Sequence, residues 1–194
     1  MRALLLLIIF VMGYHQKCHS QNPVIADSLQ TVLTVAKTDS AKLRAILALS
    51  NYYFSFDYIK SLEYARQGRQ FAQEHGMKRF EIDAIVRIGN IGISMGDNKM
   101  ASVHYFQALK YFEETKDTTG IISINNNLGA AYDRLQEYDK ALASYFKALE
   151  YLNASPQTPQ RTTIFPTLYN NIANIYQSKG DPKSALQYYQ KALA

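Results

Sequence analysis

The stretch that decides the fold reads LGAAYDRLQEYDKALASYFKA and runs from Leu128 to Ala148. The large apolar Leu128 is followed by the small Gly129, and Ala141 stands twelve positions after that glycine. Tyr145 and Ala148 then follow at steps of four and three. Because residues three or four positions apart lie on one face of an α-helix, this spacing predicts two helices that approach each other closely through small residues.

The same pattern occurs elsewhere in the chain. The positions of Gly129, Ala141, Tyr145 and Ala148 are matched in two other copies by Gly89, Ala101, Tyr105, Ala108 and by Ala173, Ala185, Tyr189, Ala192. An earlier and weaker copy has Ser50, Ser61, Ala65 and Gly68 at these positions. Such self-similarity at a period of roughly 40 residues predicts an array of stacked helix pairs.

This pattern resembles the tetratricopeptide repeat family, whose motif is W-x2-L-G-x2-Y, then A-x3-F, then A. The resemblance covers about residues 43–194 and implies an all-α fold, a right-handed α-solenoid of about four antiparallel helix pairs. The tryptophan position departs from the family in each copy, where it holds Ile46, Ile85, Asn125 and Tyr169. Asn125 is the unexpected residue, because this position normally packs in the core.

The expected domain organisation follows from the repeats. We expect repeats at about 43–81, 82–121, 122–165 and 166–194, with the last one incomplete. Residues 21–42 are expected to form a leading helix and a linker, with the helix at 26–37 capping the stack. Its apolar stripe consists of Leu29, Val32, Leu33 and Ala36. Gly180-Asp181-Pro182 predicts a turn that ends one helix and starts the next.

Residues 1–20 predict a signal peptide. Arg2 precedes ten uninterrupted apolar residues, 3–12, whereas a membrane span needs about 20 and a signal-peptide core about 7–15. We expect cleavage after Ser20 and export to the periplasm or the extracellular space, and the alternative is an uncleaved N-terminal membrane anchor. The only cysteine, Cys18, lies in this segment, so disulfides and a cysteine-based zinc site are excluded from the mature chain.

The composition limits the possible functions. The chain has 194 residues, of which 47% are hydrophobic, and this content excludes wholesale disorder. Its net charge of +5 comes without a run of Lys or Arg, so no nucleic-acid partner is expected. The few His residues are scattered, and no catalytic, metal-binding or cofactor motif is readable. We therefore expect a protein that is not an enzyme and holds no cofactor.

The resemblance implies a concave groove that binds peptides. In this family, the residues directly after the tryptophan and glycine positions point into the groove. They are Leu47, Val86, Asn126 and Asn170 in the first set, and Asn51, Asn90, Ala130 and Asn174 in the second. An amide side chain has two donors and an acceptor, so a row of Asn could bond a peptide backbone in either direction. Leu47, Val86 and the nearby Phe54 could hold an apolar anchor. The alternative is that Asn is merely tolerated on an exposed helix face.

These features predict an exported module that binds a protein or peptide partner. A short signal peptide, a leading helix and repeats of this length are similar to the N-terminal extracytoplasmic repeat regions of bacterial sensor histidine kinases, which implies a sensory or assembly role in signalling. The alternatives are a free-standing scaffold and, least favoured, an enzyme with an unrecognised site. The last repeat stops early, so we expect either a longer array or a homodimer through the C-terminal repeat. A membrane association is expected only if the native chain continues into a transmembrane segment.

Overall fold

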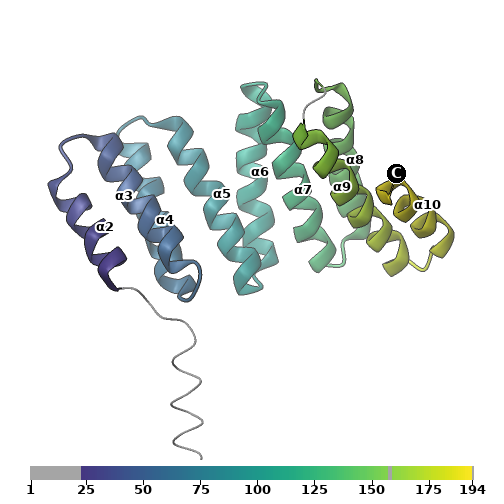
Figure 1. The fold of residues 1–194 in the computed structure, drawn as a ribbon, viewed down its shortest axis with the longest axis horizontal. Coiled ribbons are helices and arrows are strands. Elements are labelled where there is room, and N and C mark those ends of the chain that lie inside the picture. The colour runs from purple at the N-terminus through teal and green to yellow at the C-terminus, as the bar shows by residue number, and fades with distance from the viewer. Residues whose placement is uncertain (1–22, 157–158, 194) are drawn as a thin grey trace, which may run out of the picture. The chain divides into compact units, whose positions relative to one another are not determined.

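The computed structural model describes residues 23–156 and 159–193, and these residues form helices joined by short turns (Figure 1). The predicted signal peptide at 1–20 lies outside the described residues. The helices are α2 (Pro23–Val35), α3 (Asp39–Tyr53), α4 (Tyr58–Glu74), α5 (Lys78–Met95), α6 (Asn98–Glu114), α7 (Thr118–Arg134), α8 (Tyr138–Ala154), α9 (Pro159–Ser178) and α10 (Pro182–Leu193). No helix in this part of the chain is both long and apolar enough to span a bilayer. The chain divides within α4 into two compact units, one up to Tyr64 and one from Ala65 onward.

The first unit contains α2, α3 and the beginning of α4. α2 packs against α3, and Thr38 caps α3 because its hydroxyl accepts from the backbone N–H of Ala41. Ser50 and Ser61 occupy the close approach between α3 and α4, and both are buried. The Ser50 hydroxyl donates to the Ser61 carbonyl at 2.9 Å, and the Ser61 hydroxyl donates to the Ser50 carbonyl at 2.8 Å. This weaker copy of the repeat thus joins its two helices by a reciprocal pair of hydrogen bonds.

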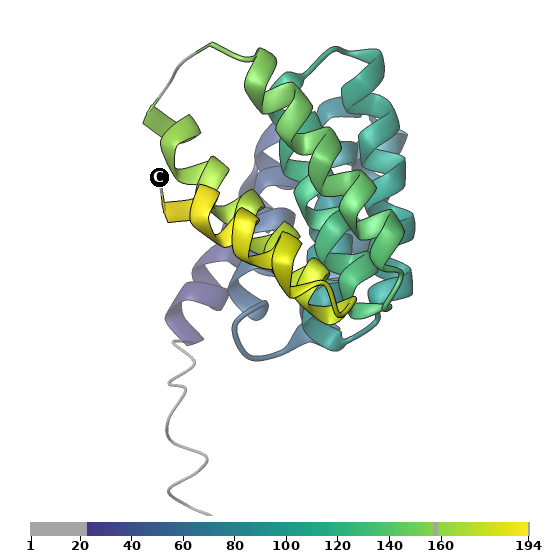
Figure 2. The same cartoon turned by 90° about the vertical axis from the view of Figure 1, so that its right-hand side faces the viewer.

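In the second unit each helix from α5 to α9 packs against the helix that follows it, and α7 also contacts α9. α9 and α10 lie next to each other in both views (Figures 1 and 2). The apolar residues of the second unit form two clusters. One surrounds Tyr105 between α5, α6 and α7, and the other surrounds Tyr145 between α7, α8 and α9. On α10, Leu186 and Leu193 are exposed.

Glycine is required where α5 comes closest to α6 and where α7 comes closest to α8. A Cβ atom added to Gly89 would lie 2.5 Å from the ring of Tyr105, and one added to Gly129 would lie 2.5 Å from the ring of Tyr145. Such distances are far below van der Waals contact, so a side chain at either position would push the helices apart. The spacing between the small residue and the tyrosine, read from the sequence, therefore corresponds to a direct contact in the structure.

Five turns between the described helices share one device. Each uses a single residue with a left-handed backbone, and these residues are Gly76, Gly96, Lys116, Gln136 and Gly180. Three of the turns also end in an aspartate whose side chain accepts a hydrogen bond from a backbone N–H of the next helix. The N–H of Met100 donates to Asp97, that of Gly120 to Asp117 and that of Ser184 to Asp181. The turn predicted at Gly180-Asp181-Pro182 has this structure.

Asn125 occupies the tryptophan position of its repeat and is only 4% exposed. Its side-chain NH2 donates to the backbone carbonyl of Ile121 in the preceding turn of α7 at 2.9 Å. A buried amide is tolerated when its hydrogen bonds are made inside the protein. Asn125 is therefore a core residue in spite of its polarity.

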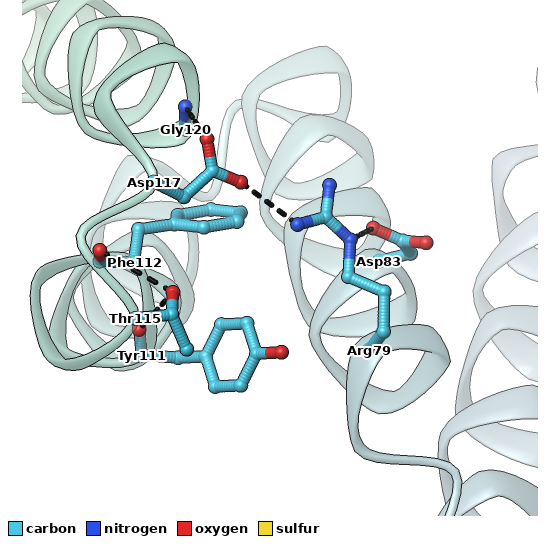
Figure 3. Close-up of polar contacts among 7 residues, drawn as sticks. All are labelled: Arg79, Asp83, Tyr111, Phe112, Thr115, Asp117 and Gly120. Atoms are coloured by element: carbon cyan, nitrogen blue, oxygen red, sulfur yellow. Dashed lines mark hydrogen bonds and ion pairs between the residues drawn. The ribbon is translucent and has the colours of Figure 1, made fainter.

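A charged cluster joins the start of α5 to the turn between α6 and α7 (Figure 3). The Arg79 Nη1 donates to Asp117 Oδ2 at 2.8 Å, and its Nε lies 3.4 Å from Asp83 Oδ1. The guanidinium also lies 5.4 Å from the ring centroid of Phe112. The hydrogen bond from the Gly120 N–H, together with Arg79, lowers the pKa of Asp117. One aspartate thus caps α7 and holds the preceding helix pair.

Candidate peptide-binding face

The second unit carries five of the predicted groove residues on its first helices. Val86 and Asn90 lie on α5, Asn126 on α7, and Asn170 and Asn174 on α9. Val86 and Asn126 are half-buried and the other three are exposed. We call this set the candidate face.

The remaining predicted residues belong to the first unit, which is described by itself. Leu47 is only 8% exposed, so it offers little surface to a ligand. Phe54 is half-buried and packs edge-on against Tyr58, with ring centroids 5.7 Å apart. Asn51 is exposed. Leu47 and Phe54 therefore make contacts inside the protein and leave little surface for an apolar anchor of a ligand.

Two asparagines of the candidate face accept hydrogen bonds from tyrosines of the following helix. The Tyr105 hydroxyl donates to Asn90 Oδ1 at 2.7 Å, and the Tyr189 hydroxyl lies 2.6 Å from Asn174 Oδ1. Tyr189 Oη also lies 2.9 Å from Gln177 Oε1, although a hydroxyl has one hydrogen to donate. In both pairs the asparagine precedes its tyrosine by 15 residues.

Asn126 makes a different contact. Its Oδ1 accepts from Asn171 Nδ2 at 3.1 Å, and this bond joins α7 to α9. The side-chain oxygens of Asn90, Asn126 and Asn174 therefore all accept hydrogen bonds from other residues of the protein. Their side-chain NH2 groups can then donate to a ligand. The sequence suggested amides that could serve as donors or acceptors alike. The structure favours donors, which would pair with backbone carbonyls of a bound segment.

The middle of the candidate face differs from its two ends. Ala130 occupies the position that Asn90 and Asn174 hold in the neighbouring pairs, and Asp133 occupies that of Gln177. Tyr145 is 2% exposed, and its pKa is raised by burial and by the negative charge of Asp133. Burial likewise raises the pKa of Asp133. Burial raises the pKa of Tyr105 to about 12.

The tyrosine hydroxyls were not among the site residues expected from the sequence. The rings of Tyr105 and Tyr145 fill the close contact between paired helices. The constant step of 15 residues from Asn90 to Tyr105 and from Asn174 to Tyr189 was the available sign that these two hydroxyls reach the first helix. Within residues 23–156 and 159–193, no group of three or more His, Cys, Asp or Glu is placed to hold a metal ion.

Parts of the sequence match known repeat proteins. Tetratricopeptide repeat models match residues 126–160 and residues 166–194. A tetratricopeptide repeat protein 29 from Trypanosoma brucei brucei is 31% identical over 129 residues, which are 64% of this chain and 27% of that protein. The response regulator aspartate phosphatase H of Bacillus subtilis is 22% identical over 184 residues, which are 91% of this chain and 47% of that protein. The chain thus spans about half or less of the length of these relatives.

Among solved structures, BtubC from P. vanneervenii is similar in fold. The TM-score is 0.76 at 17% sequence identity, and the match covers 86% of this chain and 68% of that one. The described helices, the repeat matches and this similarity confirm the predicted all-α, solenoid-type fold. Residues 126–160 and 166–194 thus match tetratricopeptide repeats, and the similarity to solved structures extends to the fold.

Proposed function

We propose that the chain is a protein–protein interaction module that holds an extended segment of its partner on the candidate face. The observation that carries the proposal is the position of the asparagines. Asn90, Asn126, Asn170 and Asn174 recur on α5, α7 and α9, and three of them have their oxygens engaged inside the protein. Asn is a poor helix former, about 0.5 kcal/mol worse than Ala, so its repeated use here calls for a function beyond helix formation.

The chemistry of the candidate face indicates what kind of segment it would hold. Amide NH2 groups donate to carbonyl oxygens, which every peptide backbone provides. No Lys or Arg occupies the groove positions expected from the sequence, so a grip on a terminal carboxylate is not proposed. The recognition would therefore rest on backbone contacts, with sequence preference supplied by the side chains in between.

One relative gives the proposal some support. Its name, response regulator aspartate phosphatase, gives a protein as the object of its action. We extend to this chain only the property of engaging a protein partner. We do not extend the phosphatase activity, because the chain covers 47% of that relative and its sequence contains no readable catalytic motif. An enzyme with an unrecognised site stays the least favoured alternative.

We further propose that the module is exported and serves as the sensory or assembly part of a bacterial signalling protein. The apolar run 3–12 after Arg2 supports export. Mass spectrometry of the protein recovered from the periplasm tests it, and the expected mature N-terminus is Gln21. Retention of residues 1–20 would favour the membrane anchor instead. A reading frame that stops at Ala194 would favour the free-standing scaffold.

A displayed library of random linear peptides tests the binding function. We expect the folded chain to enrich peptides whose binding falls at least several-fold with Asn170→Ala, because this exposed amide would bond the ligand. The matched control is Gln107→Ala, which removes an exposed amide from α6, outside the candidate face. Asn90→Ala should also weaken binding. Tyr105→Phe removes the hydrogen bond to Asn90 but keeps the Asn90 amide, so it shows how much of the Asn90→Ala effect comes from losing that internal bond. Equal binding by all these variants at unchanged melting temperature would refute the proposal.

A further inference from the structure

The surface of α10 carries two exposed leucines. Leu186 and Leu193 are 59% and 90% exposed, and they stand seven residues apart, so they lie on one face of the helix. Their counterparts in the preceding helix pair, 44 residues earlier in the sequence, are Leu142 and Leu149 of α8. Those two side chains are only 9% and 7% exposed. α10 therefore presents to solvent the two positions that α8 keeps buried.

The structure shows what covers these positions on α8. Leu142 and Leu149 belong to the apolar cluster that also contains Leu168, Ile172 and Ile175 of α9, and α8 packs against α9. The covering helix thus offers apolar side chains at steps of four and three residues, which is one face of an α-helix. The equivalent surface of α10 fits another helix with an exposed apolar face, and such surfaces can mark interaction sites.

The first described helix, α2, has such a face. α2 packs against α3, and Ala26 is buried while Leu33 is half-buried. Ile25, Val32 and Val35 are exposed. Their spacing of seven and three residues places these three side chains on one side of α2.

The charges select which of these surfaces can pair. α10 contains Lys183 and Lys191 and no acidic residue, and Lys183 stands one turn before Leu186. α2 contains Asp27 and no basic residue. Two copies of α10 would bring like charges together, and so would two copies of α2, whereas α2 and α10 carry opposite charges. Apolar surface and charge are therefore complementary only between α2 and α10.

We propose that α10 binds α2 of a second copy of this chain in a head-to-tail contact. The side of α2 with Ile25, Val32 and Val35 packs on Leu186 and Leu193 of the other copy, as α9 packs on α8 within one chain. Because the two surfaces differ, repeated contacts of this type close into a ring or continue as a fibre. The inference goes beyond the proposed function, since the candidate face lies on α5, α7 and α9.

Analytical ultracentrifugation of the full chain over a range of concentrations tests the proposal. We expect the average mass to rise with concentration above the mass of one copy. Two double variants each remove one surface: Ile25→Gln with Val32→Gln on α2, and Leu186→Gln with Leu193→Gln on α10. All four residues are exposed, so both variants should keep the wild-type melting temperature. Each variant alone should stay monomeric at every concentration.

Mixing the two variants identifies the occupant of α10. The α2 variant keeps an intact α10, and the α10 variant keeps an intact α2. An equimolar mixture should therefore form a dimer and nothing larger, because only one contact between intact surfaces is possible. The matched control replaces Val103 and Phe106 by Gln, which removes exposed apolar side chains from α6, and it should associate as the wild type does.

Several outcomes would overturn the proposal. A wild-type chain that is monomeric at all concentrations would do so, and so would a mixture of the two variants that stays monomeric. An α2 variant that still dimerises alone would show that two α10 surfaces pair instead, and an α10 variant that dimerises alone would show the same for α2. Peptide binding that depends on Asn170 is measured separately, so the proposed function can hold while the head-to-tail contact fails.

Discussion

At the scale of single residues, the fold depends on a glycine that lies against a tyrosine ring. Gly129 and Tyr145 make this contact between α7 and α8, and Gly89 and Tyr105 make it between α5 and α6. In the last pair the glycine is replaced by Ala173, and Tyr189 is less buried than the other two tyrosines.

The substitution Gly129→Ala should destabilise the protein. The added methyl would lie 2.5 Å from the buried Tyr145 ring, and overpacking of this kind costs about 1–3 kcal/mol, while the better helix propensity of Ala offsets about 1 kcal/mol. Urea unfolding should show a net loss. In a Tyr145→Leu background the ring is gone, so the same change should become neutral or stabilising. An equal loss in both backgrounds would show that the contact is not the cause.

The positions that form these contacts could be predicted from the sequence, because small and aromatic residues at fixed helical spacing leave one packing solution. Which hydrogen bonds the asparagine side chains make could not be predicted. Spacing places Asn90 and Asn174 on a helix face, but their partners belong to the next helix and depend on its approach in space. For the same reason, the burial of Leu47 and the internal hydrogen bond of Asn125 became visible only in three dimensions.

At the scale of the helices, the turns decide where each helix ends. Lys116 and Gln136 adopt the left-handed backbone with φ values of 55° and 59°. This conformation costs about 1–2 kcal/mol for a residue with a Cβ atom and is nearly free for glycine. The corresponding turns at Gly76, Gly96 and Gly180 avoid that cost.

Gln136→Gly should therefore stabilise the chain by about 1 kcal/mol, reduced somewhat by the greater freedom of glycine in the unfolded state. The gain would appear as a higher melting temperature in differential scanning calorimetry. Gly96→Ala, the reverse change in an equivalent turn, should lower the melting temperature. If both variants melt lower than the wild type, the backbone conformation of Gln136 is not what limits this turn.

Asp117→Asn should make the stability depend less on pH. The pKa of Asp117 is lowered in the folded state by the Gly120 N–H and by Arg79, so its ionised form stabilises the fold above the ordinary pKa of 3.8. This stabilisation is lost as the pH falls through the lowered folded-state value. At neutral pH the variant should lose about 1 kcal/mol, as expected for a weakened helix cap, and the difference should shrink toward pH 3. A difference that is constant with pH would exclude this charge as the cause.

At the scale of the whole molecule, the second unit is held together by contacts between successive helices. Its two apolar clusters meet at α7 and share the half-buried Tyr132 and Tyr151. In such an array, stability is approximately the sum of the pairs and their interfaces, so damage should remain local.

Leu168→Ala tests this expectation. Leu168 is fully buried in the cluster formed with α8, and its truncation should cost about 2–5 kcal/mol. Amide hydrogen exchange should accelerate in α8, α9 and α10, while α5 and α6 keep most of their protection. Ile85→Ala in the other cluster should give the reverse distribution. Uniform acceleration along the unit in both variants would mean that it unfolds as a single cooperative block.

The small sequence separation of the Gly–Tyr contacts also affects how the chain folds. Gly89 and Tyr105 are only 16 residues apart, so this contact can form as soon as α5 and α6 are free to fold, while α7 to α10 are still unfolded. The next helix pair can then pack on a helix pair that is already formed. Local contacts of this kind favour rapid folding and limit the time during which apolar surface is exposed to other unfolded chains.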